Sequence, residues 1–154
     1  MGRISLFLSS GLGIGYIPKA SGTFGTLWGF LLYYLCRGFD PWVLWVGTPI
    51  FVLLSFVFIH FAEKQLGSHD SSIIVLDEIA GYLVAVLGIS FNFWTAALGF
   101  GLFRLFDIWK PFPIGQIDRK WKGVWGVLCD DLVAGIYANL TVRIFLIIWD
   151  FFSR

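Results

Sequence analysis

Long uncharged segments alternate with short charged loops along this chain. The uncharged segments cover residues 20–36, 41–62, 79–103 and 132–149, and a single arginine interrupts the last of them. A helix that crosses a bilayer needs about 20 mainly apolar residues, so these segments are long enough, or nearly so, to span a membrane. The pattern predicts an all-α, polytopic membrane helical bundle of about four to five helices, forming one domain over residues 1–154.

The third segment, residues 79–103, is long for one helix, and Gly88 and Asn92 bracket a turn-forming stretch at its centre. Basic residues favour the cytoplasmic side, and they occur before this segment, at Lys64, and after it, over residues 110–122. Because both loops then lie on one side, the segment crosses an even number of times. We predict two shorter helices folded as a hairpin or re-entrant pair; the alternative is a single tilted span.

The composition agrees with a membrane protein and excludes several classes of function. Hydrophobic residues make up 58% of the chain and charged residues 14%, and the mean hydropathy is +0.81, which leaves too little polar surface for a soluble domain. The net charge of +1 attracts no nucleic acid. Cys36 and Cys129 lie far apart, and two histidines cannot complete a zinc site. We expect a membrane as partner, without nucleic acid, zinc or a disulfide framework.

Two acidic pairs each lead directly into an apolar segment. They are Asp77-Glu78 and Asp130-Asp131. They hold four of the ten acidic residues, and a charge beside hydrocarbon is costly unless it is paired, hydrated or metal-bound. The simplest explanation is an active site at the edge of the membrane; the alternative is that both pairs only cap helix starts, where the helix dipole favours negative charge. Together with Asp70 and Asp107 they also form an all-oxygen set of the kind that binds Mg²⁺, which we favour over capping alone.

Three charged residues recur at every third position before a proline. Arg104, Asp107 and Lys110 share one helix face until Pro111 ends the helix. One interpretation is that they simply pair with one another. A helix end that presents two cations beside aromatic residues also suits a lipid phosphate, whose oxygens the cations neutralise. We therefore predict that Arg104 and Lys110 contact the substrate.

A loop rich in glycine and hydroxyl groups precedes the first apolar helix. Residues 18–26 read Pro-Lys-Ala-Ser-Gly-Thr-Phe-Gly-Thr, and the free N–H groups of the helix start that follows can hold an anion. An ordinary capped loop is the alternative. The candidate phosphate-binding residues of this loop are Lys19, Ser21, Thr23 and Thr26.

Other phosphatase chemistries do not fit the residues. A cysteine phosphatase needs an arginine soon after its thiolate, but the next arginine after Cys129 is Arg143. Histidine-based lipid phosphatases need two histidines among basic residues, and neither His60 nor His69 has such neighbours. A metal-activated water or an aspartyl nucleophile remains. Arg143, deep in the last apolar segment, has no evident partner and is expected to snorkel toward the interface.

Four of these segments, in this order, resemble the phosphatidylglycerophosphatase A family of bacteria. They are residues 18–26, residues 74–81, residues 103–114, and Asp130-Asp131 with Ala134-Gly135. Ser21, Val124 and the Leu128-Cys129 pair depart from residues common in the family, but none of these changes removes a charged group. The resemblance implies a Mg²⁺-dependent enzyme of phospholipid biosynthesis that removes the terminal phosphate of phosphatidylglycerophosphate to leave phosphatidylglycerol.

The resemblance also implies roles for individual residues. The metal-binding, catalytic carboxylates that it implies are Asp77, Glu78, Asp130 and Asp131. Asp107 would be a further ligand or the catalytic base, while Lys19, Arg104 and Lys110 would neutralise phosphate oxygens. The acyl chains would stay in the bilayer, and the site would face the cytoplasm in a bacterial inner membrane.

Two other classes of function remain as alternatives. A CDP-alcohol phosphotransferase also uses clustered aspartates at a membrane face, but its longer Asp-Gly-Ala-Arg-type pattern is absent here. A small non-enzymatic transporter or scaffold would explain the apolar helices, but not four motifs in a fixed order. The sequence leaves open the oligomeric state and the range of lipid phosphates accepted.

Overall fold

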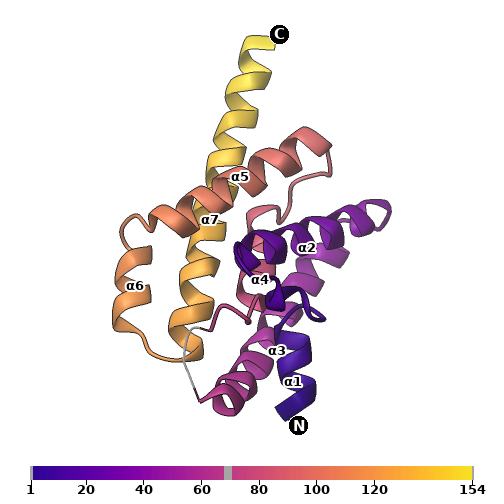
Figure 1. Cartoon of the computed structure of the whole chain (residues 1–154). Coiled ribbons are helices and arrows are strands. Elements are labelled where there is room, and N and C mark those ends of the chain that lie inside the picture. Colours follow the sequence, from indigo (N-terminus) through magenta and orange to yellow (C-terminus); the bar gives the residue numbers. More distant parts are fainter. Residues whose placement is uncertain (1, 68–70, 154) are drawn as a thin grey trace.

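The computed structural model describes residues 2–67 and 71–153, and these residues form helices and no strand. The helices are α1 (Gly2–Ser9), α2 (Ser21–Leu35), α3 (Trp42–Leu66), α4 (Leu76–Ala85), α5 (Phe93–Trp109), α6 (Ile114–Lys120) and α7 (Val124–Ser153), with two 3-10 turns, η1 (Ile14–Tyr16) and η2 (Cys36–Gly38) (Figure 1). The predicted all-α class is confirmed, but the predicted number of helices is too low. The pattern missed α1 and α6, which pack against α3 and α7, because both are shorter than a membrane span.

A break divides the third apolar segment into α4 and α5. α4 ends at Ala85 and α5 begins at Phe93. Asn92 caps α5, because its side-chain oxygen accepts a hydrogen bond from the backbone N–H of Trp94 at 2.9 Å. Gly88 in the connection has a φ of 68°, which glycine adopts without strain. The predicted pair of shorter helices is confirmed, and the single tilted span is wrong.

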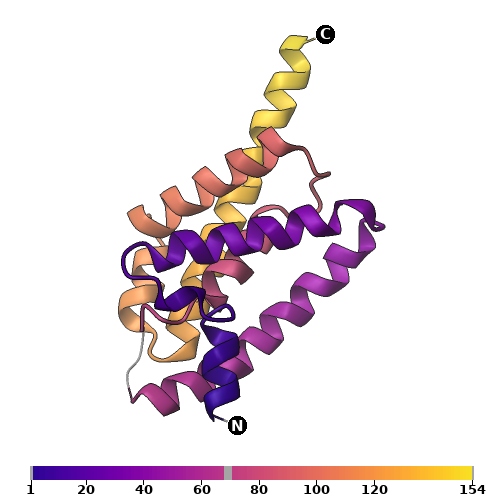
Figure 2. The same cartoon turned by 45° about the vertical axis from the view of Figure 1, so that its right-hand side comes forward.

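In the part of the chain that the structure describes, two helices, α3 and α7, are long and apolar enough to cross a membrane by length and composition. Large apolar side chains on both are exposed, among them Leu53 and Ile147. The C-terminal part of α7 projects beyond the other helices (Figure 1 and Figure 2). At 15 and 17 residues, α2 and α5 are shorter than a full crossing requires.

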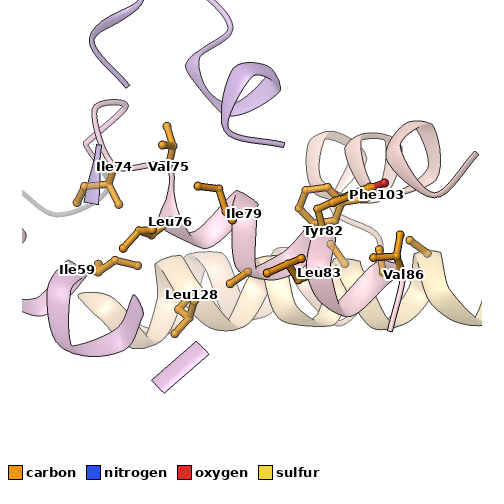
Figure 3. Packing of buried hydrophobic residues seen from close by; sticks show 14 of the residues in the cluster. Ile59, Ile74, Val75, Leu76, Ile79, Tyr82, Leu83, Val86, Phe103 and Leu128 are labelled. Atoms are coloured by element: carbon orange, nitrogen blue, oxygen red, sulfur yellow. The ribbon is translucent and has the colours of Figure 1, made fainter. Parts of the chain in front are cut away.

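The short helix α4 lies at the centre of the bundle and contacts α2, α3, α5 and α7. Tyr82 is fully buried, and its hydroxyl donates a hydrogen bond to the carbonyl of Ala96 on α5. Figure 3 shows Ile79 and Leu83 of α4 among the apolar side chains that fill the core. Because packing surrounds it on several sides, α4 is a fixed platform for the residues at its ends.

α4 and α7 meet closely at two glycines, Gly81 and Gly135. A Cβ on Gly135 would overlap the backbone carbonyl of Gly81, and a Cβ on Gly81 would lie 2.8 Å from the backbone oxygen of Asp131. Asp77 precedes Gly81 by four residues, and Asp131 precedes Gly135 by the same interval. Residues at this spacing form the ridges by which helices interdigitate. The contact between the glycines therefore brings Asp77 and Asp131 together, one helical turn before the contact on each helix.

Replacing Gly135 with valine should force α4 and α7 apart. The added Cβ meets the Gly81 backbone, which cannot move aside as a flexible side chain can, so we expect the free energy of unfolding to fall by about 2 kcal/mol. Gly101→Ala is the control, because its added Cβ meets open space on α5. Thermal unfolding in detergent, followed by circular dichroism, compares both with the wild type; an unchanged midpoint for Gly135→Val would contradict the close contact.

Candidate active site

Four helix ends gather at one end of the bundle, on the left of Figure 2. α2 and α4 run side by side in the same direction, because Gly22 lies against Glu78 and Gly29 lies against Tyr82. α4 and α7, which touch at Gly81 and Gly135, also run parallel to each other. α5 runs the opposite way, so its C-terminal end meets the starts of α2 and α4 and the first turns of α7.

Five carboxylates meet at this end of the bundle. Asp77, Glu78 and Asp131 each place one oxygen within 4.8 Å of the others, and so do Asp107, Asp130 and Asp131. Asp131 belongs to both groups and is buried. Oxygen atoms at this spacing can close around a divalent cation. The structure thus brings together all five of the predicted catalytic carboxylates.

The two acidic pairs occupy different places in their helices. Asp77 and Glu78 lie in the first turn of α4, as predicted. α7 already begins at Val124, so Asp130 and Asp131 lie inside the helix, away from its start. The prediction that both pairs mark helix starts is therefore wrong for the second pair, because buried apolar residues before it extend the helix. Capping does not account for these two buried aspartates.

The start of α2 forms one wall of the cluster. A Cβ on Gly22 would overlap Oε1 of Glu78 and would lie 3.0 Å from Nη1 of Arg104, so the backbone of α2 passes directly beside both side chains. The N–H groups in the first turn of a helix have no acceptor within the helix and favour anions. This wall and Arg104 together can bind phosphate oxygens next to the carboxylates.

Arg104 and Lys110 bind carboxylates of the cluster in different ways. Nη1 of Arg104 donates a hydrogen bond to Oδ2 of Asp107 at 2.6 Å. Nζ of Lys110 donates to Oδ2 of Asp130 at 2.8 Å and lies 2.7 Å from Oδ1 of Asp118. The interpretation in which the three charged residues pair with one another thus holds for Arg104 and Asp107. The prediction that all three share one helix face is wrong for Lys110, because α5 ends at Trp109 and Lys110 has a φ of 48°; its side chain reaches α6 and α7 instead.

Asp118 is a further member of this network that the sequence motifs did not predict. The sequence contained a signal for Asp118, because it is the one acidic residue in the basic stretch from Lys110 to Lys122. Burial lowers the pKa of Lys110, but the hydrogen bonds to Asp118 and Asp130 outweigh that effect and raise it above the ordinary value. The ammonium group therefore stays charged. Asp70, which was also predicted to contribute, lies outside the described residues.

Carboxyl groups outnumber cations in the cluster. Among the described residues, two of its five carboxylates form ion pairs, Asp107 with Arg104 and Asp130 with Lys110. Burial raises the pKa of Asp77 well above its ordinary value, and the carboxylates of Glu78 and Asp130 raise it further. Oδ1 of Asp77 and Oε2 of Glu78 are buried without a hydrogen-bond partner among the described residues. Such unpaired oxygens are suitable ligands for a divalent cation.

The predicted phosphate-binding residues around the start of α2 are less closely tied to the cluster. Within the described residues, no hydrogen bond or ion pair joins Lys19, Ser21 or Thr23 to a carboxylate, and Lys19 is exposed. Thr26 is fully buried and donates its hydroxyl to the carbonyl of Gly22 at 2.7 Å. Thr26 thus supports the start of α2, which itself contacts Glu78 and Arg104.

Comparison with known proteins identifies close relatives of the chain. A family model described as phosphatidylglycerophosphatase A matches residues 7–146. Phosphatidylglycerophosphatase A of Escherichia coli K12 is 36% identical over 131 residues, which cover 84% of this chain and 76% of the relative. The Haemophilus influenzae protein of the same name is 36% identical over 137 residues, which cover 88% and 84% of the two chains.

A third relative carries a different name. A Bacteroides thetaiotaomicron protein, named provisionally as a phosphatidylinositol-3-phosphatase, is 30% identical over 148 residues, which cover 92% of each chain. No solved structure shows a significant match. The segment matched by the family model, residues 7–146, contains every residue of the carboxylate cluster and its cationic partners. The chain therefore belongs to the phosphatidylglycerophosphatase A family.

Proposed function

We propose that this protein hydrolyses phosphatidylglycerophosphate to phosphatidylglycerol and phosphate, and that the reaction requires Mg²⁺. One observation carries the proposal: buried Asp131 contributes to two groups of carboxylate oxygens, beside Arg104 and the start of α2. A cation site next to an anion site is what hydrolysis of a phosphomonoester needs. The names of the Escherichia coli and Haemophilus influenzae relatives support the choice of substrate.

The carboxylates suit Mg²⁺ in number and in kind, because this ion prefers oxygen ligands and keeps several waters. The residues that would hold it are Asp77, Glu78, Asp130 and Asp131. Asp107, bound to Arg104, would be a further ligand or the base. Mg²⁺ in this position would polarise the phosphate group and lower the pKa of a bound water.

The side chains and backbone of the site would bind and orient the substrate. Arg104 and the N–H groups at the start of α2 neutralise phosphate oxygens. Lys110 is already bound to Asp118 and Asp130, so we assign it the role of holding Asp130 in place. Water attacks phosphorus while a carboxylate of the cluster accepts its proton. The bond from phosphorus to the glycerol oxygen breaks, and the carboxylate passes the proton it took from water to that oxygen, so that phosphatidylglycerol and inorganic phosphate form and the carboxylate is restored.

Family membership and the two apolar helices α3 and α7 make this a membrane protein. We propose the bacterial inner membrane, with the carboxylates facing the cytoplasm. The exposed basic residues Lys120 and Lys122 support this orientation, because α6 is tied to the cluster through Asp118 and basic loops favour the cytoplasmic side. The acyl chains of the substrate would remain in the bilayer beside the apolar helices.

Phosphate release from phosphatidylglycerophosphate should depend on Mg²⁺. We expect the detergent-purified protein to release phosphate with Mg²⁺, to stop when EDTA is added, and to recover when Mg²⁺ is returned in excess. A colorimetric phosphate assay measures all three conditions. Phosphatidylinositol 3-phosphate is the parallel substrate, because the Bacteroides relative carries that name; faster release from it would replace our choice of substrate. Folded protein that hydrolyses neither lipid would contradict the phosphatase proposal.

Asp131→Asn should abolish most turnover while the protein stays folded. The amide keeps the shape of the side chain but removes a negative charge that both carboxylate groups share, so we expect turnover to fall by about a hundredfold or more. Asp40→Asn, on the surface before α3, is the control. Assays at saturating Mg²⁺, with circular dichroism to check folding, decide the matter. Ordinary activity in folded Asp131→Asn would remove this residue from the mechanism.

Arg104→Met should impair substrate capture and reaction together. Loss of the guanidinium removes positive charge beside the start of α2, so we expect kcat/KM for the lipid to fall by about a hundredfold. Arg37→Met provides the comparison, because Arg37 is exposed near the opposite end of α2, over the ring of Tyr34. Steady-state kinetics in mixed micelles give both values. Equal kcat/KM in the two variants would exclude Arg104 from phosphate binding.

A further inference from the structure

The last carbonyl groups of α4 lie inside the bundle and need hydrogen-bond donors. A helix leaves its final carbonyls without N–H partners, and such groups are costly where water is excluded. Here the donor comes from α7. Nδ2 of Asn139 lies 3.2, 3.0 and 2.9 Å from the backbone oxygens of Val84, Ala85 and Leu87. The two N–H bonds of this amide are thus shared among three carbonyls at and just after the end of α4, of which that of Val84 also accepts the backbone N–H of Leu87.

Arg143 completes this contact from the next turn of α7. Its Nε donates a hydrogen bond to Oδ1 of Asn139 at 2.8 Å, and its Nη2 donates to the carbonyl of Leu87 at 2.9 Å. Its positive charge stands at the negative, C-terminal end of the α4 dipole. Arg143 therefore has partners within the protein that the sequence did not indicate, and the expectation that it snorkels toward the interface stays a prediction.

The backbone connection after α4 leaves space for the side chain of Arg143. A Cβ on Gly88 would lie 2.8 Å from Nη2 of Arg143 and 2.6 Å from Cζ2 of Trp45, so a larger residue would displace the guanidinium. From the other side, the hydroxyl of Tyr33 on α2 donates a hydrogen bond to the carbonyl of Ile89 at 2.7 Å. The C-terminal end of α4 is thus held from both α2 and α7.

Asn139 and Arg143 lie in register with the carboxylate cluster. Asp131, Gly135, Asn139 and Arg143 follow one another at four-residue intervals and form one row along α7. The first residue of the row faces the carboxylates of α4, the second contacts Gly81, and the last two bind the end of α4. α4 has ten residues, so it is about 15 Å long and a shift at one end moves the other.

We propose that Asn139 and Arg143 are positioning residues. By binding the carbonyl end of α4 they fix this helix along α7, and so they hold Asp77 and Glu78 opposite Asp131. The consequence for a bound cation rests on the proposed function, whereas the anchoring of α4 does not. Without these hydrogen bonds α4 would move against α7, and its two carboxylates would lose their alignment with Asp131.

Two variants test the anchor. Asn139→Asp keeps the shape of the side chain but replaces the donor with an acceptor. Arg143→Met removes every donor of the guanidinium. If Arg143→Met does not fold, Arg143→Lys replaces it. Thr141→Val is the matched control, because Thr141 lies between the two residues and donates its hydroxyl within α7, to the carbonyl of Tyr137 at 2.8 Å. Hydrogen–deuterium exchange of the α4 amides and Mn²⁺ affinity by electron paramagnetic resonance are measured on folded protein in detergent.

We expect the α4 amides to exchange about tenfold faster, and Mn²⁺ to bind about tenfold more weakly, in both variants but not in Thr141→Val. Unchanged exchange of the α4 amides in both variants would contradict the proposal that Asn139 and Arg143 anchor α4. Faster exchange with unchanged Mn²⁺ affinity would overturn the positioning role, because a merely structural contact does not alter metal binding. Wild-type protein that binds no Mn²⁺ would contradict the proposed metal site instead, and the exchange data would still decide whether α4 is anchored.

Discussion

The close contact between Gly81 of α4 and Gly135 of α7 is the constraint on which the site depends. It lets two backbones touch where side chains would keep them apart. One turn before the contact, Asp77 and Asp131 meet; one turn after it, Asn139 binds the end of α4. Because these positions repeat at four-residue intervals along α7, one helix row provides a carboxylate of the cluster, a backbone contact and a hydrogen bond to the end of α4.

The buried carboxylates and their two cationic partners determine what chemistry this site can perform. Buried carboxylates that outnumber their cationic partners destabilise a protein unless something compensates them, so their presence at one point indicates use rather than stability. Arg104 and Lys110 compensate part of the charge, and within residues 2–67 and 71–153 one oxygen each of Asp77 and Glu78 has no hydrogen-bond partner. Membership of the phosphatidylglycerophosphatase A family agrees with an enzyme and not with a transporter or scaffold.

Local sequence patterns predicted the helical class, the break near Gly88 and the five carboxylates, because hydropathy, turn residues and isolated charges are local signals. They did not predict that α7 begins at Val124 or that Arg143 has partners. Both depend on tertiary packing: buried apolar residues lengthen α7, and Arg143 binds a carbonyl 56 residues away in the chain. The four-residue row from Asp131 to Arg143 was visible in the sequence, but its meaning required the position of α4.

The most direct test of a metal site in this carboxylate cluster is the position of a divalent cation in crystals of this protein grown with Mn²⁺. Anomalous diffraction at the manganese edge locates the ion without reference to activity. We expect a peak in contact with Asp131 and with carboxylates of α4, α5 or both. A well-ordered site that shows no peak there, with the carboxylate oxygens satisfied by protein donors alone, would contradict the claim that this cluster binds a metal.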